Sequence, residues 1–348
     1  MAAIAEIDAG AFRRNLQKLS ALVAPTPVMA MVKANAYGHG MVVLAREAVA
    51  AGCEWLGCLE ISAALELRDA GIDVRLFAWL HGRDADFAAA AAQGVDVGVT
   101  AAWQLEAIAR AKPMRPLRIH LKIDSGLHRN GIPPEEWEAA VRCALDLERS
   151  GVVEITGIWS HLADAGYDND RDALAELLAA VDQAAALGAR PRLVHLAASS
   201  AGIREPEARL DLVRFGIAAY GISPFDDETG LELGLEPVMT VKSTVVAWGD
   251  DGIVQAGAGF ADGIAPDAGP EAEVLVGGKR ARILSVDVDT CTIASDAPHG
   301  SEVVFFGAPA GLAPHAEEWA AWAGTIGDEI VTRIAVRVPR VAVDATPH

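Results

Sequence analysis

The sequence predicts an α/β fold, a (β/α)8 TIM-like barrel followed by a mainly β C-terminal domain. Residues 1 to about 222 alternate short apolar runs with Ala- and Leu-rich amphipathic stretches, as parallel βα units do. From Leu235 onward, the pattern changes to short β-type runs. A chain of 348 residues also suits a barrel of about 250 residues plus a smaller domain. We therefore expect two domains, residues 1–225 and 226–348.

Eight apolar runs predict the strands that a closed barrel requires. They are Pro27–Val32, Trp55–Leu59, Val74–Ala78, Val95–Val99, Arg118–Ile123, Glu154–Ser160, Leu193–Ala197 and Leu212–Ile217. Amphipathic stretches between them predict helices near residues 42–51, 63–70, 101–111, 135–150 and 171–187. Glycines stand where these helices should end, and we expect them to act as C-terminal caps: Gly52, Gly71, Gly151 and Gly188.

In the second domain, the sequence predicts a set of strands interrupted by one helical insertion. The strands are expected at Met239–Trp248, Gly252–Gly257, Glu273–Val276, Lys279–Val288, Glu302–Phe306 and Ile334–Val338. The helix-like insertion is expected within Ala308–Ile326.

Composition limits the partners that this chain can have. A formal net charge of −19 opposes binding to nucleic acid or to anionic lipid, since both require clustered Lys and Arg. No run of about 18 uncharged apolar residues predicts a membrane span, and the N-terminus has no basic and apolar signal. The four cysteines show no zinc-type spacing, so we expect free thiols, no metal and a cytoplasmic location.

The most informative segment follows the first predicted barrel strand. Lys33 comes directly after the apolar run that ends at Val32, and a loop rich in glycine and polar residues follows it. Barrel enzymes hold their catalytic groups at this end of their strands. A lysine amine there can bond covalently to a carbonyl group, which is how pyridoxal phosphate is held. Val-Lys-Ala alone is also typical of a lysine that extends from a strand end to solvent.

The whole string Val32-Lys33-Ala34-Asn35-Ala36-Tyr37-Gly38-His39-Gly40 resembles the pyridoxal-phosphate lysine motif of the alanine racemase family. The resemblance implies pyridoxal 5′-phosphate as cofactor and an amino acid as substrate. It makes Lys33 the covalent anchor and a general acid or base at Cα, and it makes Tyr37 a phosphate contact. An aromatic ring packed at the barrel rim is the alternative for Tyr37.

The block from Val213 to Gly221 resembles a second family motif. By this resemblance, Arg214 faces the pyridine nitrogen, Gly216 and Ile217 offer backbone N–H groups to the phosphate, and Ser199 adds its hydroxyl. An arginine stays protonated and cannot give the ring a proton, so the ring is a weaker electron sink, which suits proton abstraction with fast return. Without the family, Arg-Phe-Gly is equally typical of a salt-bridged strand end.

Two further segments match the family at strand ends. His161 follows the sixth strand, and the resemblance makes it a stacking and hydrogen-bonding neighbour of Arg214 and the cofactor, although a lone histidine is commonly structural. Arg129 matches an arginine that reaches the cofactor's phenolic oxygen and the substrate carboxylate. Lys122 matches a lysine that is carbamylated in many members and supports that arginine.

The resemblance fails in the second domain. Gly259-Phe260-Ala261-Asp262-Gly263 matches a family motif, but Trp248–Ile253 stands where the family has the catalytic tyrosine that the partner subunit supplies. All three tyrosines of the chain, Tyr37, Tyr167 and Tyr220, lie in the barrel region. Val336 replaces a phosphate-binding tyrosine, and Val288 replaces a methionine beside the matching Asp289.

These observations indicate a divergent alanine racemase-like enzyme acting at Cα, an amino-acid racemase or epimerase with Lys33 as one base. Asp287, Asp289, Cys291 or a water held by them are candidates for the second base, although a structural role is more typical of each residue. Alternatives are a decarboxylase, an aldolase-type lyase, a single-face proton transfer on a bulkier amino acid, or a non-catalytic cofactor-binding protein. A zinc-assisted lyase is disfavoured because no paired His and Cys ligands are found near the C-terminus. A homodimer is expected, because in the family the active site is completed across the dimer interface.

Overall fold

A computed structural model describes residues 3–163, 166–249, 252–269, 271–309 and 311–343. The chain forms two compact units, and each is built from separate stretches of sequence. One comprises Met1–Leu16, Ala34–Glu47 and Ile217–His348, and we call it the sheet unit. The other comprises Gln17–Lys33 and Ala48–Gly216, and we call it the barrel unit. The domain division between residues 225 and 226 stays a prediction.

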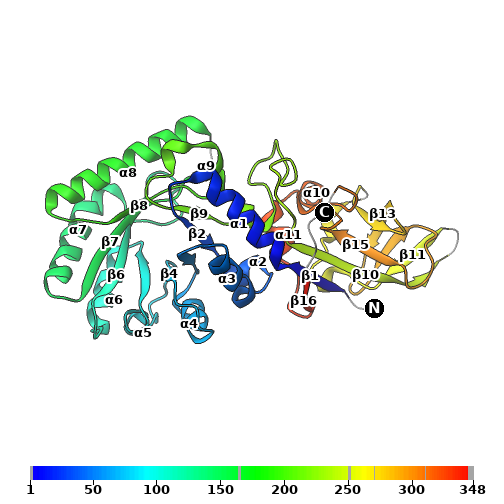
Figure 1. Cartoon of the computed structure of the whole chain (residues 1–348), viewed down its shortest axis with the longest axis horizontal. Helices are drawn as coiled ribbons and strands as arrows, with labels where there is room; N and C mark the ends of the chain where they lie inside the picture. The colour runs from blue at the N-terminus through cyan, green and yellow to red at the C-terminus, as the bar shows by residue number, and fades with distance from the viewer. Residues whose placement is uncertain (1–2, 164–165, 250–251, 270, 310, 344–348) are drawn as a thin grey trace. The chain divides into compact units, whose positions relative to one another are not determined.

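The barrel unit contains eight parallel strands, which confirms the predicted barrel (Figure 1). They are β2 Val28–Met31, β3 Trp55–Gly57, β4 Arg75–Ala78, β5 Val95–Val99, β6 Leu117–Lys122, β7 Val153–Trp159, β8 Leu193–His195 and β9 Val213–Phe215. Each lies within or one residue beyond a predicted run, and their order is β8-β7-β6-β5-β4-β3-β2-β9. Backbone hydrogen bonds from Asp211 to Val194 and from Arg214 to Ala197, both 3.1 Å, link the two ends and nearly close the barrel.

Helices follow the strands as the amphipathic stretches predict. Those predicted are α3 Met41–Ala50, α4 Ile61–Asp69, α6 Ala102–Ala111, α7 Pro134–Arg149 and α8 Tyr167–Leu187. The glycines at their ends have φ between +77° and +110°, a left-handed conformation that glycine adopts without strain, so their predicted capping role is confirmed. The sequence reading missed the other helices, α1 Ala9–Val23, α5 Phe87–Ala92 and α9 Ser199–Arg204, and the 3₁₀ turns η1 Pro206–Ala208 and η2 Ile217–Tyr220.

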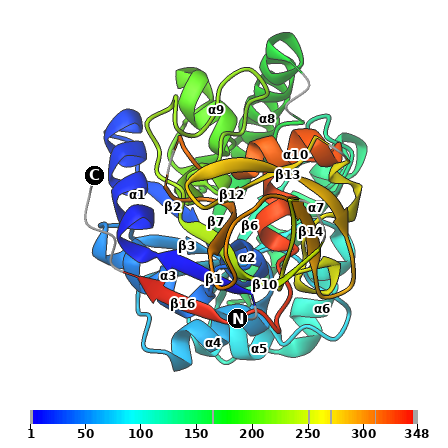
Figure 2. The ribbon, with the colours of Figure 1, turned by 90° about the vertical axis from the view of Figure 1, so that its right-hand side faces the viewer.

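The sheet unit is mainly β, as predicted, and Figure 2 shows its strands. Its strands are β1 Ile4–Asp8, β10 Met239–Trp248, β11 Ile253–Ala256, β12 Glu273–Val276, β13 Lys279–Val286, β14 Cys291–Ala294, β15 Glu302–Phe306 and β16 Arg340–Val343. Their order is β11-β14-β13-β12-β15-β10-β1-β16, and β11 also pairs with β10, which closes six of them into a ring. The 3₁₀ turns are η3 Phe260–Asp262 and η4 Pro266–Ala268.

Two expectations for the second half of the chain were wrong. Ile334–Val338 is not a strand, because the Arg340 guanidinium binds the carbonyls of Ile334, Ala335 and Val338 at 2.5–2.7 Å and holds the segment in turns. The insertion contains the helix α10 Ala316–Ala323, but a second helix, α11 Gly327–Thr332, follows it. Within the described part of the chain, no helix is both long and apolar enough to span a membrane.

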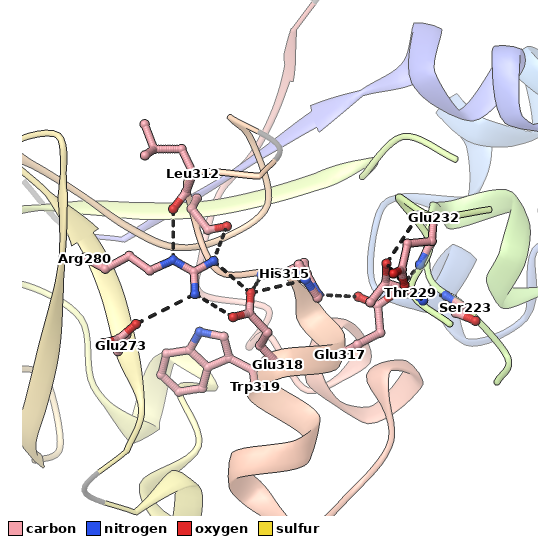
Figure 3. A network of polar contacts seen from close by, with 12 residues as sticks. Ser223, Thr229, Glu232, Glu273, Arg280, Leu312, His315, Glu317, Glu318 and Trp319 are labelled. Carbon is pink, nitrogen blue, oxygen red and sulfur yellow. Dashed lines mark hydrogen bonds and ion pairs between the residues drawn. The ribbon is translucent and has the colours of Figure 1, made fainter. Parts of the chain in front are cut away.

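A polar network secures the loop that leads into β10 (Figure 3). The Glu317 carboxylate at the start of α10 accepts the backbone N–H groups of Ser223 (3.0 Å) and Gly230 (2.9 Å). His315 lies between two carboxylates, 3.2 Å from Glu317 and 3.3 Å from Glu318. Arg280 binds Glu318 on its other side at 2.5 Å. A protonated His315 can donate to both carboxylates, whereas a neutral ring can donate to only one.

We expect His315→Gln to destabilise the protein more at low pH than at high pH. The hydrogen bond to Glu317 raises the pKa of His315 despite its burial, so its stabilisation is full below the unfolded pKa of about 6.5 and is lost as the pH rises through the folded pKa. The difference in unfolding free energy from the parent should be about 1.5–3 kcal/mol at pH about 5.5 and should shrink by pH about 8.5. Thermal unfolding across this range measures it, with exposed His299→Gln as the control. A difference independent of pH would contradict the role of the charged ring.

Candidate active site

Six of the predicted site residues belong to the barrel unit and lie at or beyond the C-terminal ends of its strands. Lys33 follows β2, Arg129 lies in the loop after β6, His161 follows β7, Ser199 begins α9, and Arg214 and Gly216 lie in and after β9. The other two, Tyr37 and Ile217, belong to the sheet unit. Strand ends of a parallel barrel converge at one rim, which is where barrel enzymes place their catalytic groups.

The turn after Lys33 has an unusual backbone. Ala34, Asn35, Ala36 and Tyr37 are consecutive and all have φ between +50° and +54°, so they form one turn of left-handed helix. This conformation costs about 1–2 kcal/mol per residue when the residue is not glycine. The Asn35 side chain accepts the N–H of Met41 at 2.8 Å, and Gly38 donates to the carbonyl of Ala34 at 2.9 Å. Strain held in place by such contacts is typical of functional sites.

Arg214 is the buried cation of the barrel interior. Its terminal nitrogens donate to Nδ1 of His195 (2.9 Å), to Nδ1 of His161 (3.1 Å) and to the carbonyls of Ser160 (3.0 Å) and Leu196 (2.7 Å). Burial and the neighbouring Arg129 lower the pKa of Arg214 to about 9, so it stays a cation at neutral pH. Among the described residues no carboxylate forms an ion pair with it, and no acceptor contacts its Nε–H.

The positively charged residues of the site all affect the pKa of His161. Burial first, and then Arg214, Arg129, Lys122 and Lys33, lower the pKa of His161 well below its ordinary value. The ring is therefore neutral at neutral pH. Since Nδ1 accepts a hydrogen bond from Arg214, the hydrogen of the ring is on Nε2. The predicted contact between His161 and Arg214 is present in the structure.

Lys122 and Arg129 add two more cations to this group. The ammonium of Lys122 is buried and donates to the carbonyl (3.0 Å) and to the side-chain oxygen (2.5 Å) of Asn130. Burial, together with Arg129 and Arg214, lowers the pKa of Lys122 to about 7. The uncharged amine is therefore more accessible near neutral pH than in an ordinary lysine, and carbamylation requires an uncharged amine. The modification itself stays a prediction.

The predicted phosphate-binding residues form a local hydrogen bond within the barrel unit. The Ser199 hydroxyl accepts the backbone N–H of Gly216 at 3.1 Å, so this N–H group is aimed at the start of α9. Both residues lie at the loops after β8 and β9, the last two strands of the barrel in chain order. Loops after the last two strands are a frequent phosphate-binding position in barrels of this type.

In the sheet unit, Tyr37 packs against a second tyrosine. The rings of Tyr37 and Tyr220 lie 4.8 Å apart, and Phe12 and His39 contact the same Tyr220 ring. Burial raises the pKa of Tyr37 above its ordinary value. Ile217 begins η2 and is buried. The structure therefore contains the aromatic packing that the sequence left open for Tyr37.

The structure argues against two of the candidates for a second base. The Asp289 carboxylate binds Arg337 at 2.6 Å, and burial raises the pKa of the Cys291 thiol to about 12. Trp248 ends β10, β11 begins at Ile253, and the two strands pair antiparallel, so only four residues of sequence stand where the family has its tyrosine loop. Val336, at the position of the second missing tyrosine, is 98% exposed. No group of three or more His, Cys, Asp or Glu residues in the described ranges could hold a metal ion.

Sequence reasoning gave no role to three buried polar residues behind Arg214, namely Asp96 on β5, His120 on β6 and His195 on β8. A signal for one of them existed. His120 and Lys122 are two residues apart on one strand and therefore face the same side of it, the side that carries Lys122 into the barrel.

Comparisons with known proteins agree with the geometry. The family model of the alanine racemase N-terminal domain matches residues 7–224, and the family model of the alanine racemase C-terminal domain matches residues 239–342. The chain is 39% identical to the alanine racemase of Streptomyces coelicolor, over 98% of this chain and 95% of that one, and 38% identical to that of Frankia casuarinae, over 97% and 95%. The crystal structure of alanine racemase from a D-cycloserine-producing Streptomyces lavendulae is similar at a TM-score of 0.94 and 36% identity, covering 99% of this chain and 98% of that one.

Proposed function

The chain belongs to the alanine racemase family, a family of pyridoxal-phosphate-dependent isomerases, and we propose that it moves a proton at the Cα of an amino acid with Lys33 as the acid and base. The observation that carries the proposal is the group of four cationic residues, Lys33, Lys122, Arg129 and Arg214, whose charges all act on the neutral His161.

The donor set of the barrel unit fits pyridoxal 5′-phosphate, the cofactor of this family. A phosphate, a phenolic oxygen and a substrate carboxylate are all anionic, and the barrel residues offer cations in excess of carboxylates to receive them. When bound, the cofactor draws electrons from Cα and so acidifies its hydrogen. Lys33 would hold it covalently, Ser199 would bind its phosphate, and the Nε–H of Arg214 would face its ring nitrogen. The family resemblance adds Tyr37, Gly216 and Ile217 to the phosphate contacts.

Each polar residue has a distinct task in this proposal. The Lys33 amine would take the proton from Cα on one face of the substrate and could return a proton on that face. His161 is neutral and fixed by Arg214, so it would lie beside the cofactor ring without adding charge. Arg129 would bind the substrate carboxylate, as its family counterpart does. Arg214 stays a cation and would therefore leave the nitrogen of that ring without a proton.

One observation favours a second candidate function. Only four residues of sequence separate β10 from β11, and the tyrosine that serves the second face in the family is missing from the whole second half of the sequence. A site that lacks this loop has room for a bulkier amino acid. The second candidate is therefore a single-face reaction at Cα of such a substrate, with decarboxylation and aldol-type cleavage as the variants to be tested.

We further propose that the protein is a cytoplasmic homodimer with domains 1–225 and 226–348. The two family-model matches are separated between residues 224 and 239, which supports the division. Free thiols at Cys53, Cys58, Cys143 and Cys291 are typical of a reducing compartment. Exposed Phe260, Val288 and Val336 in the sheet unit offer apolar surface to a partner subunit. Light scattering at several concentrations tests the dimer.

The test of the function is proton exchange at Cα in deuterated water, with a panel of L- and D-amino acids and a chirality assay of each product. Exchange with any amino acid, dependent on Lys33, supports the proposal. Conversion without exchange, with loss of carbon dioxide or of an aldehyde, favours the second candidate. Binding of the cofactor with no chemistry on any amino acid would leave only a cofactor-binding protein.

We expect Arg214→Glu to change the electronic state of the bound cofactor. A glutamate can share a proton with the ring nitrogen, whereas the permanent charge of arginine cannot, and a protonated ring withdraws electrons from Cα more strongly. Addition of an amino acid should then produce a persistent absorption band at longer wavelength than in the parent. Arg192→Glu, an exposed arginine before β8, is the matched control. Parental spectra and rates in a folded, cofactor-loaded Arg214→Glu protein would contradict the pairing.

A further inference from the structure

A chain of hydrogen bonds runs through the interior of the barrel unit from the start of β5 to Arg214. The Nη1 group of Arg214 lies 2.9 Å from Nδ1 of His195. Nε2 of His195 lies 3.0 Å from Nδ1 of His120, and Nε2 of His120 lies 3.3 Å from the Asp96 carboxylate. The side chains of Asp96 and His120 and the whole of His195 are inaccessible to solvent.

The two ends of this chain fix the direction of every bond in it. An arginine can only donate, so Nδ1 of His195 must accept. A carboxylate can only accept, so Nε2 of His120 must donate. Both rings then carry their hydrogen on Nε2, and the bond between them runs from His195 to His120. All the donors point from Arg214 toward Asp96.

Two arginines stabilise the negative charge of Asp96 at the end of this chain. Arg75 binds its Oδ2 at 2.5 Å, and Arg118 binds its Oδ1 at 2.6 Å. Burial alone would raise the pKa of Asp96, but His120, Arg75 and Arg118 outweigh burial and lower the pKa below its ordinary value. A buried carboxylate of this kind is costly unless it is paired. Asp96 is paired with the two arginines and also, toward the barrel interior, with His120.

We propose that Asp96 is a positioning residue for the reaction, which orients Arg214 by keeping Nδ1 of His195 its acceptor, through the neutral rings of His120 and His195. The proposal rests on the proposed function, because Arg214 matters only if it faces the cofactor ring. Asp96 serves as the distant counter-charge of an arginine that has no carboxylate partner of its own among the described residues.

Reversal of the chain shows why the charge of Asp96 matters. If His120 carried a hydrogen on Nδ1, it would donate to Nε2 of His195. His195 would then carry its hydrogen on Nδ1, facing the N–H of Arg214, and two donors would meet in a buried site. An unsatisfied buried group costs about 1–3 kcal/mol. For a neutral His120 the carboxylate excludes this state, because it always requires a donor at Nε2 of that ring.

The first measurement is direct and does not need activity. Protein labelled with ¹⁵N in its nine histidines, with and without pyridoxal phosphate, gives the protonation state of each ring nitrogen, and His120→Gln and His195→Gln assign the signals. We expect both rings to be neutral with hydrogen on Nε2, as the directions of the hydrogen bonds require. A charged His120, or a His195 protonated on Nδ1, overturns the proposal.

The second measurement uses Asp96→Asn, with Asp211→Asn as the matched control. Asp211 accepts the N–H of Val194 beside His195 but lies outside the chain. In cofactor-loaded Asp96→Asn we expect a second tautomer of His195 and a fall in kcat/KM of about 10–100-fold, the usual effect of removing the partner of a functional histidine. The control should show neither. Parental His195 signals in folded Asp96→Asn overturn the proposal, and if this variant does not fold, the parental tautomers decide. A parent protein without any Cα activity would refute the proposed function, while the His195 signals and the cofactor spectrum of Asp96→Asn still test the chain.

Discussion

Lys33→Ala should abolish covalent retention of pyridoxal phosphate and reduce turnover by more than about 10⁴-fold. Loss of a positioned acid/base alone costs about 10²–10⁴, and this substitution also removes the covalent anchor. Lys33 follows β2 and precedes a turn of four residues in the left-handed conformation. These two elements hold the backbone of Lys33 in place. The measurement is borohydride reduction of the loaded protein, followed by digestion and identification of the labelled peptide.

Lys122 is the rival for this label, because its lowered pKa leaves much of its amine uncharged. A label on Lys122, or on no lysine, would refute the assignment to Lys33. Exposed Lys279→Ala is the control and should keep parental binding and turnover. Added methylamine should restore part of the exchange activity of Lys33→Ala, because a free amine can replace the missing base but not its position. Failure of rescue in a variant that still binds the cofactor would indicate that Lys33 anchors without acting as base.

The strands of the barrel could be predicted because they are buried on both faces. Such strands form continuous apolar runs such as Val28–Met31. Ile4–Asp8 was missed because β1 alternates buried and half-buried residues and is only five residues long. Its assignment depends on pairing with β10 and β16, which are more than 200 residues away in the sequence. Ile334–Val338 was wrongly assigned because an apolar run does not reveal that one arginine binds its carbonyls.

The candidate site was predictable only where short motifs carry it. Lys33 and Arg214 stand in strings specific enough to be identified by resemblance. Asp96, His120 and His195 are on three different strands, and only the register of the parallel sheet brings them into line. No local pattern encodes such a contact, because its partners come from strands that are far apart in the sequence. The absence of tyrosine beyond Tyr220 could be read directly, since it is a matter of sequence alone.

The reaction that this enzyme catalyses therefore depends on whether an acid/base serves the second face of the substrate. Racemisation through two bases requires an acid/base on each side of Cα. In the proposed mechanism Lys33 serves one side. Of the candidates for the other side, Asp289 is bound by Arg337 and burial raises the pKa of the Cys291 thiol to about 12, which leaves Asp287 as the remaining side chain.

Deuterium should accordingly enter one enantiomer of alanine faster than its optical activity is lost, by at least about tenfold. The reason is that Lys33 can remove and return the proton on its own face, while delivery to the other face lacks the positioned group that contributes about 10²–10⁴ in rate. The measurement follows deuterium uptake by mass spectrometry and chirality by chromatography in the same samples, with Lys33→Ala as the blank. If L- and D-alanine interconvert at about 10 per second, a rate typical of enzymes, another residue must serve the second face. Asp287→Asn, Asp289→Asn and Cys291→Ser would then identify it, and a single-face reaction would be ruled out.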